Sequence, residues 1–403
     1  MARGLAKRLD VVRPSVTMVV SAKAARLRAE GVDVIGLAAG EPDFDTPEHI
    51  KLAAKQALDR GATKYTAVEG TPELRRAVAM WFAKAHGFDV SPEEVMVSAG
   101  AKQVVFNAFH ALLDQGDEVV LPAPCWVSYA EIAKLAGAVA IPVPARAADG
   151  FIVDPTAVAR AITPATRMIV VCSPSNPTGA VYDEATWRAI VDLVVRHDLW
   201  LLTDDIYRSL CYGGARFVQP ATFGPEVRKR TIIVDGVSKS YAMTGWRIGF
   251  ALAAPEIIAG MSTLQGQSTT NAAAVSQAAA LAAVTGPDDD LERMRLEFDR
   301  RRLLMLDRLR AIPGMTCVEP KGAFYAFPDV TAFLGRDTPS GRRIDDDLSL
   351  SEYLLDEARV AVVPGSAFFA PGFLRLSYAT SQANIEKALA RIATALGKLT
   401  GRR

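Results

Sequence analysis

Seven short apolar runs divide the middle of the chain at regular intervals. They cover residues 94–99, 118–122, 139–143, 168–173, 199–204, 231–236 and 248–253. Segments with helical periodicity lie between several of them, for instance residues 185–198. Short apolar strands that alternate with helices predict an α/β fold with a mainly parallel sheet covered on both faces. In such sheets ligands bind beyond the carboxyl ends of the strands, so the loops after these runs are the expected site.

Helix start and stop signals flank the strand region. Thr46-Pro47 and Thr71-Pro72 each combine an N-cap hydroxyl with a proline in the first turn. The two helices that they predict should end at Gly61 and Gly87, because glycine favours helix C-termini. The charged segment 286–310 predicts a long helix that leads into a second domain.

Chain length and these signals together predict two domains. A chain of 403 residues, half of them apolar, can bury a large core and divide. We expect a large domain over residues 46–290. The smaller α/β domain is expected to combine both chain ends, residues 1–45 and 291–403.

Composition narrows the class of protein. A net charge of +1 lacks the basic bias of nucleic-acid and membrane-surface binders. The four cysteines are far apart without a C-x-x-C, and the four histidines are scattered, so neither a disulfide framework nor a metal site is expected. No apolar run approaches the roughly 20 residues of a membrane span, and the first residues lack a hydrophobic signal core. These features predict a soluble cytoplasmic enzyme.

One lysine stands out in the segment DGVSKSYAMTGWRIGF, residues 235–250. Lys239 lies in a turn of small and hydroxyl residues between two strand-like runs, and Arg247 follows eight positions later. Such a lysine is poorly placed for an ordinary solvated charge. It is well placed for a desolvated amine that forms an imine with a carbonyl compound.

Three further strand-following loops carry polar side chains: SAGAKQ at 98–103, PSNPTG at 174–179 and TDDIY at 203–207. The first opens a helix, so its backbone N–H groups can hold a phosphate. The second directs Asn176 into the crevice. In the third, Asp204 ends a buried strand, with Tyr207 three residues later, and a carboxylate at that depth needs a cationic partner.

One cofactor, pyridoxal 5'-phosphate (PLP), uses all of these groups. PLP needs a lysine for its aldehyde, a carboxylate for its ring nitrogen, donors for its phenolate oxygen, and cationic or backbone groups for its phosphate. Lys239 would supply the imine and then the base, and Asp204 would keep the ring nitrogen protonated. Asn176 and Tyr207 would donate to the phenolate oxygen, and Arg247 would bind the phosphate.

The ordered set of motifs resembles the class I aminotransferases of PLP fold type I, and more narrowly their bacterial aspartate aminotransferase branch. The resemblance runs over nearly the full chain through AAGEPDFDTP (38–47), TKYT (63–66), GAKQ (100–103), PCWVSY (124–129), SPSNPTGAVY (173–182), DDIY (204–207), SKSYAMTGWRIG (238–249), GAFY (322–325) and RLSYAT (375–380). It implies a seven-stranded, mainly parallel sheet in the large domain. It also implies transfer of the amino group of an acidic amino acid, aspartate in particular, to 2-oxoglutarate by a ping-pong mechanism.

The resemblance assigns roles position by position. Lys239, Asp204 and Tyr207 match catalytic residues. The cofactor site further matches the turn at Gly100, Ala101 and Lys102, the stacking residue Trp126, the phenolate partner Asn176 and the phosphate ligands Ser238 and Arg247. Tyr65 matches a tyrosine that reaches the phosphate from a neighbouring subunit, which implies a homodimer with shared active sites.

Substrate binding is also implied by the resemblance. The clamp on the substrate α-carboxylate matches Gly40, Asn176 and Arg375, with Trp126 alongside, and the arginine would act as a bidentate fork. Lys102 matches a lysine that binds the distal carboxylate of a dicarboxylic substrate, with Ser15 and Thr17 as hydroxyl partners.

The departures and alternatives are few. Asp205 stands where the family usually has glutamate, a position outside the chemistry, and Ser175 stands where asparagine is frequent. Arg13 replaces a more usual lysine near the site entrance, which bears on substrate choice.

The same fold and cofactor also serve other donors, prephenate or aromatic substrates, and lyase or oxidase reactions. A non-catalytic regulator is disfavoured because Lys239 and Asp204 are both present.

Overall fold

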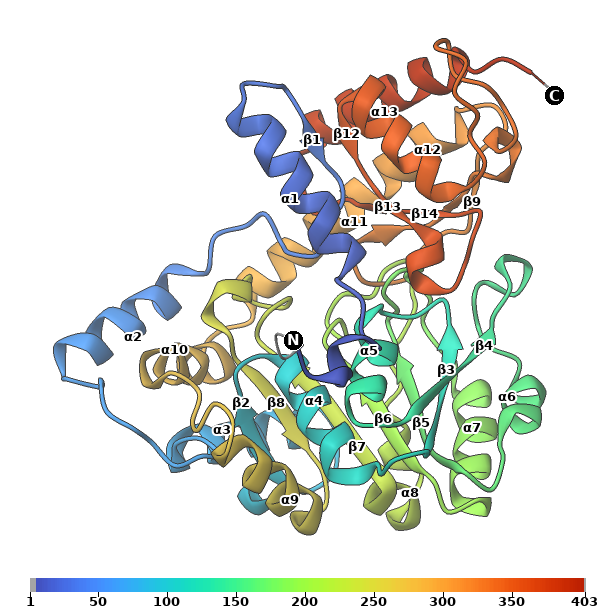
Figure 1. The fold of residues 1–403 in the computed structure, drawn as a ribbon. Coiled ribbons are helices and arrows are strands. Elements are labelled where there is room, and N and C mark those ends of the chain that lie inside the picture. Colours follow the sequence, from blue (N-terminus) through green and yellow to red (C-terminus); the bar gives the residue numbers. More distant parts are fainter. Residues whose placement is uncertain (1–4, 402–403) are drawn as a thin grey trace.

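A seven-stranded sheet forms the centre of the molecule, which is described here for residues 5–401 of a computed structural model. The sheet order is β2-β8-β7-β6-β5-β3-β4 (Figure 1). Its strands are β2 (Val95–Ser98), β3 (Glu118–Ala123), β4 (Val139–Pro144), β5 (Thr166–Cys172), β6 (Trp200–Asp204), β7 (Thr231–Gly236) and β8 (Gly249–Leu252). Only β8 runs antiparallel to its two neighbours within this sheet. The prediction of seven strands in a mainly parallel sheet is confirmed.

Helices cover both faces of this sheet. They are α2 (Glu48–Asp59), α3 (Pro72–His86), α4 (Ala101–Leu112), α5 (Ser128–Leu135), α6 (Pro155–Ala161), α7 (Glu184–Arg196), α8 (Pro225–Arg230), α9 (Pro255–Gly266) and α10 (Ala274–Thr285). Alternate residues of β7 enter different cores, as in any strand buried on both sides. Ile232 and Val234 pack in the core with α4, α5 and α9, whereas Ile233 packs with α2, α3 and α10.

One of the two predicted threonine caps is wrong. Thr71 accepts from Leu74 N at the start of α3, and that helix ends at left-handed Gly87, as expected. The Thr46 hydroxyl instead donates to Ala242 O over 2.7 Å, and α2 begins without a side-chain cap. The tertiary contact outcompetes the local one, and it ties this segment to the loop after Lys239.

The N-terminal residues and the chain after α10 form a second group of elements above the sheet (Figure 1). They are α1 (Val16–Ala29), β1 (Ile35–Gly36), α11 (Asp289–Arg310), β9 (Thr316–Cys317), β10 (Tyr325–Ala326), β11 (Pro328–Asp329), α12 (Asp347–Tyr353), β12 (Val360–Ala361), β13 (Val363–Pro364), β14 (Leu374–Ser377) and α13 (Gln382–Gly397). The two chain ends meet where β1 pairs in parallel with β12. The exact domain limits stay a prediction.

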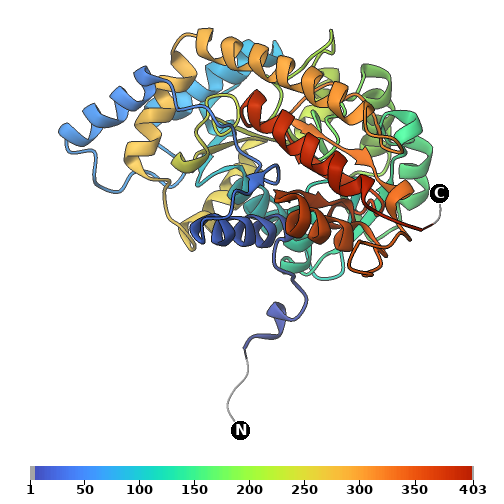
Figure 2. The same ribbon diagram turned by 90° about the horizontal axis from the view of Figure 1, so that it is seen from above.

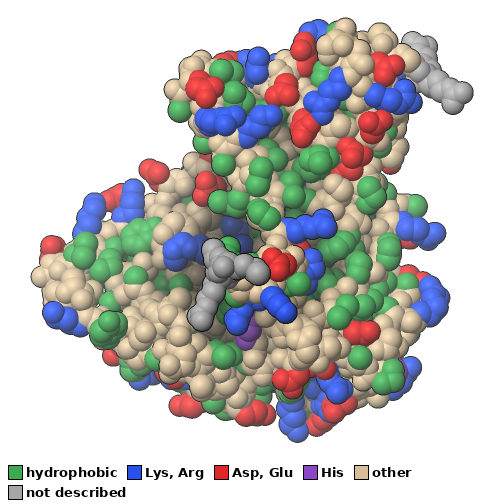
Figure 3. Space-filling model, viewed as in Figure 1, with side chains coloured by type: hydrophobic (Ala, Val, Ile, Leu, Met, Phe, Trp, Pro, Cys, Tyr) green, Lys and Arg blue, Asp and Glu red, His purple; other side chains and the backbone are tan. Residues whose placement is uncertain are grey.

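The first described residues, from Leu5 to about Val11, extend away from the rest of the chain, whereas α1 lies beside the C-terminal helices (Figure 2). The chain rejoins the body at Arg13, whose N–H donates to Glu131 of α5 over 2.7 Å. Lysine, arginine and acidic side chains are interspersed over the face shown in Figure 3. Among the helices of residues 5–401, none is both long and apolar enough to cross a membrane.

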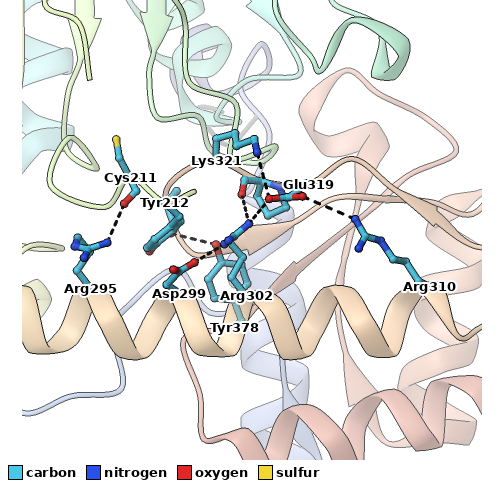
Figure 4. A network of polar contacts seen from close by, with 11 residues as sticks. Cys211, Tyr212, Arg295, Asp299, Arg302, Arg310, Glu319, Lys321 and Tyr378 are labelled. Atoms are coloured by element: carbon cyan, nitrogen blue, oxygen red, sulfur yellow. Dashed lines mark hydrogen bonds and ion pairs between the residues drawn. The ribbon is translucent and has the colours of Figure 1, made fainter. Parts of the chain in front are cut away.

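A polar network fixes the long helix α11 to the loops around it (Figure 4). The buried guanidinium of Arg302 donates to Asp299 within the helix and to Glu319 beyond it, each over 2.7 Å. Arg295, about two turns earlier, donates to Cys211 O over 3.3 Å. Because these partners come from before and after the helix, α11 is held to both groups of elements.

Candidate active site

A cavity of about 330 Å³ lies where β5, β6 and β7 end, the position expected for a ligand in a parallel sheet. It is lined by Ser15, Thr17, Met18, Gly40, Ala101, Lys102, Trp126, Ser128, Cys172, Asn176, Asp204, Ile206, Tyr207, Ser238, Lys239, Arg247, Tyr325 and Arg375. All of the site residues expected from the sequence are in this lining except Tyr65 and Gly100, and Gly100 directly precedes the lining residue Ala101 in the chain. Their individual roles stay predictions.

Lys239 presents a buried amine to this cavity. It follows β7, and its Nζ donates to Gly40 O over 2.6 Å. Burial disfavours the charged form and lowers the pKa of Lys239 to about 8. A larger share of this amine is therefore neutral near pH 7 than of an exposed lysine, which is the form that attacks a carbonyl carbon.

Asp204, the last residue of β6, has an uncharged side chain as its closest partner. Its Oδ2 accepts from the Tyr129 hydroxyl over 2.5 Å, and its Oδ1 accepts from Ile206 N over 3.3 Å. Burial raises the pKa of Asp204, and the Tyr129 hydrogen bond opposes that rise. Within residues 5–401 no lysine or arginine forms an ion pair with Asp204, and the expected cationic partner, a protonated ring nitrogen of the cofactor, stays a prediction.

The turn before α4 is built for an anion. Gly100 has a φ of 92°, and a Cβ there would lie 2.5 Å from Nη2 of Arg247, so only glycine lets the guanidinium approach this backbone. Arg247 is itself held by a 2.9 Å hydrogen bond from Nη1 to Thr244 O. The guanidinium, the N-terminus of α4 and the nearby Ser238 together suit the phosphate of PLP.

Two tyrosines and an asparagine add hydrogen-bonding groups to the same cavity. Tyr207 and Tyr325 share a 2.9 Å hydrogen bond between their hydroxyl groups. A Cβ on Gly40 would lie 2.9 Å from the Tyr325 hydroxyl, so this glycine lets the backbone reach the site. Asn176 lines the cavity next to them. Tyr207 and Asn176 thus lie in one cavity, and their role at a phenolate oxygen stays a prediction.

Arg375 is a buried cation that lacks an acid. Only 2% of its surface is exposed, and it donates to Asn176 Oδ1 over 2.9 Å and to Ala38 O over 2.7 Å. No carboxylate pairs with it in the described part of the chain. Its guanidinium lies 4.5 Å from the Tyr325 ring centroid. A buried guanidinium without a carboxylate is costly unless an anion binds to it, which indicates an anionic ligand.

Lys102 supplies a second cation to the cavity. Its Nζ lies 5.0 Å from the ring centroid of Trp126, and burial together with the charge of Arg247 lowers its pKa. No acid pairs with Lys102 within residues 5–401. Ser15 and Thr17, at the start of α1, line the same cavity and are available as hydroxyl partners.

The sequence did not predict the contacts of two site residues, Tyr129 and Tyr325. A third residue, Tyr65, was predicted for the site but lies outside the cavity of its own chain. Tyr129 and Tyr325 stand in the motifs PCWVSY and GAFY, but only the structure shows their contacts with Asp204 and Tyr207. Tyr65 lies outside the cavity and is 88% exposed. Its predicted reach into a neighbouring subunit's site stays a prediction.

Comparison with known proteins agrees with this geometry. Residues 32–392 match the family model of aminotransferase class I and II. Aspartate aminotransferase of Rhizobium meliloti is 46% identical over 98% of this chain and 97% of its own length. Aspartate/prephenate aminotransferase of Thermus thermophilus is 46% identical over 98% of this chain and 100% of its own.

Solved structures give the same result. A crystal structure of the Rhizobium meliloti enzyme superposes with a TM-score of 0.95, covering 99% of this chain and 100% of that one. Thermus thermophilus aspartate aminotransferase with maleate gives a TM-score of 0.91 at 45% identity, covering 98% and 100%. The chain therefore belongs to the class I and II aminotransferases, the transaminases of PLP fold type I that depend on pyridoxal 5'-phosphate.

Proposed function

We propose that this enzyme moves the amino group of L-aspartate to 2-oxoglutarate in two half-reactions at the cavity around Lys239. Relatives named aspartate aminotransferase match it over nearly their whole length. The maleate in the Thermus thermophilus structure is a four-carbon dicarboxylate, the same length and charge as aspartate without its amino group.

The observation that carries the proposal is the pair of cations in one cavity. Arg375 and Lys102 both line it, and neither is paired with an acid among the described residues. A ping-pong transaminase must accept the donor and the acceptor in the same site. Aspartate and 2-oxoglutarate each carry two carboxylates, so both complement these cations.

Each residue then has a separate task. Arg375, with Asn176 and the Gly40 backbone, binds and orients the α-carboxylate. Lys102 binds the distal carboxylate. PLP, when bound, takes up the amino group and withdraws electrons from the substrate α-carbon. Lys239 moves the proton to and from that carbon, and Asp204 holds the proton at the ring nitrogen.

The enzyme is also proposed to work as a homodimer. The segment before Arg13 extends from the body and carries the exposed side chains of Leu5, Leu9 and Val11 (Figure 2). Tyr65 is exposed as well. A second copy would cover these groups, and the resemblance implies that Tyr65 then reaches its partner's phosphate site.

Prephenate is a second candidate substrate. The Thermus thermophilus relative is named for aspartate and prephenate, and prephenate also carries two carboxylates. Met18, 67% exposed at the cavity lining, leaves apolar surface for a ring.

A screen of amino donors and acceptors tests both candidates. Purified holoenzyme is mixed with each donor and 2-oxoglutarate, and glutamate and free ammonia are measured. We expect glutamate with aspartate, and none without an acceptor. Ammonia release without 2-oxoglutarate would contradict the proposal and indicate a lyase. Consumption of prephenate with glutamate as the amino donor would show that prephenate is a substrate as well.

A further inference from the structure

Tyr129 is a buried tyrosine that contacts two parts of the cofactor site at once. It lies in the first turn of α5, three residues after Trp126, and none of its surface is exposed. Its ring meets that of Trp126 edge-on, with centroids 5.2 Å apart at 87°. Its hydroxyl donates to Asp204 Oδ2 over 2.5 Å. One side chain thus joins the ring-stacking residue to the carboxylate at the end of β6.

The hydrogen bond leaves the two oxygens of Asp204 unequal. Oδ2 is taken by Tyr129, whereas Oδ1 receives only the long 3.3 Å bond from Ile206 N. Tyr129 is the sole side-chain donor to Asp204 within residues 5–401. The carboxylate therefore has one oxygen fixed in the protein and one oxygen still able to accept from a ligand.

Burial is what opposes the negative charge of Asp204. Two further buried acids lie nearby, Asp205 and Asp235; burial raises the pKa of Asp235 to about 6, and Arg208 pairs with it over 2.6 Å. The thiol of Cys172, paired with Asp204 across β5 and β6, has its pKa raised well above its usual range by burial and stays neutral. Lys239 attracts this charge only from a distance.

Tyr129 keeps its hydroxyl proton in this buried environment. Burial and the adjacent Asp204 charge raise its pKa well above the ordinary value for tyrosine. The hydroxyl is therefore a permanent donor, and it stabilises the ionised form of its partner.

We infer that Tyr129 is a positioning residue for the transaminase reaction, which holds Asp204 ionised and directs Oδ1 to the cofactor's ring nitrogen. The inference rests on the proposed role of Asp204 at that nitrogen. A proton shared between ring nitrogen and carboxylate stays on nitrogen only while the carboxylate is stabilised elsewhere. Tyr129 supplies that stabilisation without occupying the ligand-facing oxygen.

The test compares holoenzymes of wild type, Tyr129→Phe and Asp204→Asn. The phenylalanine keeps the ring contact with Trp126 and removes only the hydroxyl. Tyr353→Phe is the matched control, because that buried hydroxyl donates to Ala395 O over 2.9 Å, between the C-terminal helices. The readouts are the pH midpoint of the cofactor's absorbance change, the dissociation constant for PLP, and kcat and KM for aspartate.

For Tyr129→Phe we expect kcat to fall about tenfold or more, the effect of losing one hydrogen bond to a charged group, with KM within about twofold. PLP should bind more weakly. The absorbance midpoint should move to higher pH. A ring that is less protonated withdraws electrons less strongly, so the Lys239 nitrogen loses its proton only at a higher pH. Tyr353→Phe should match wild type in all three readouts.

The outcomes distinguish the role of Tyr129 from the proposed role of Asp204 at the ring nitrogen. An altered midpoint and affinity in Asp204→Asn, with wild-type values in Tyr129→Phe, would overturn the role of Tyr129 alone. Wild-type values in Asp204→Asn would overturn the role of Asp204, and the inference with it. A Tyr129→Phe variant that loses only thermal stability would show that the hydroxyl is structural, against the inference.

Discussion

Arg375 donates from Nη1 to Asn176 Oδ1 over 2.9 Å, which joins two segments that are 199 residues apart in the chain. Asn176 follows β5 and Arg375 lies in β14, so the contact connects the central sheet to the second group of elements. The bond also fixes the plane of the guanidinium. A preset plane suits a carboxylate, which accepts two parallel N–H bonds.

The first prediction concerns this arginine. Arg375→Lys keeps the charge but loses the planar fork and the bond geometry to Asn176. We expect kcat/KM to fall by at least about thirtyfold for every amino donor, since all carry an α-carboxylate. Steady-state kinetics with aspartate and alanine measure this, with the half-exposed Arg391→Lys as control. A loss confined to aspartate would contradict the assignment.

Lys102 should behave differently. Lys102→Ala should lower kcat/KM about thirtyfold or more for aspartate and glutamate, because one partner of a desolvated charge pair is lost. Donors without a second carboxylate, such as alanine, should be spared. The same kinetic series measures both effects, and Lys134→Ala, whose lysine pairs with Glu131 outside the cavity, is the control. Equal losses for acidic and neutral donors would refute a distal-carboxylate role.

Lys239 gives a prediction with a pH dependence. Its pKa of about 8 means that the neutral amine increases as the pH rises through 8. Covalent capture of PLP by the cofactor-free protein should therefore accelerate over that range. Lys239→Ala should fold, bind PLP without the covalent link, and lose about 10²–10⁴-fold or more in turnover. Lys321→Ala, at the exposed network of Figure 4, should match wild type. Wild-type turnover in Lys239→Ala would disprove its role.

His86 should affect stability rather than activity. It packs between Phe82 and Phe88, neither ring nitrogen has a partner among the described residues, and burial lowers its pKa from 6.5 to about 3. The unfolded chain binds a proton here below pH 6.5 and the folded chain does not. The free energy of unfolding therefore falls as the pH drops, by about 1.4 kcal/mol per pH unit from this group.

His86→Phe removes that proton uptake. We expect its unfolding free energy, measured in urea at several pH values, to fall less steeply below pH 6.5 than that of wild type. The exposed His197→Gln should leave the wild-type slope unchanged. An unchanged slope in His86→Phe would show that the folded protein protonates this histidine.

The sequence predicted the central sheet well because its signal is local. Each strand is a short apolar run, and the strands inside the sheet are buried on both faces, so hydrophobicity marked them. The edge strand β4 is largely exposed or half-buried, but its sequence is apolar as well. Motifs such as those around Asp204 and Lys239 follow strand ends directly. Parallel topology then brings them to one edge without further information.

Contacts between residues far apart in the chain could not be predicted from the sequence. Tyr129 meets Asp204 across 75 residues, and Thr46 meets Ala242 across 196, so neither pairing has a local pattern. The sequence therefore carried no indication that the Tyr129 hydroxyl donates to the buried carboxylate of Asp204. The structure of a single chain cannot show the expected contact of Tyr65, because its partner would belong to a second copy.

A single half-reaction tests the central claim most directly. Purified holoenzyme is mixed with L-aspartate without any oxo acid, and oxaloacetate and the cofactor's absorbance are followed. The account predicts one oxaloacetate per active site and then arrest. After the remaining aspartate has been removed, adding 2-oxoglutarate should restore the original spectrum and yield one glutamate per site. Continued product formation with ammonia release, or no reaction with aspartate, would contradict it.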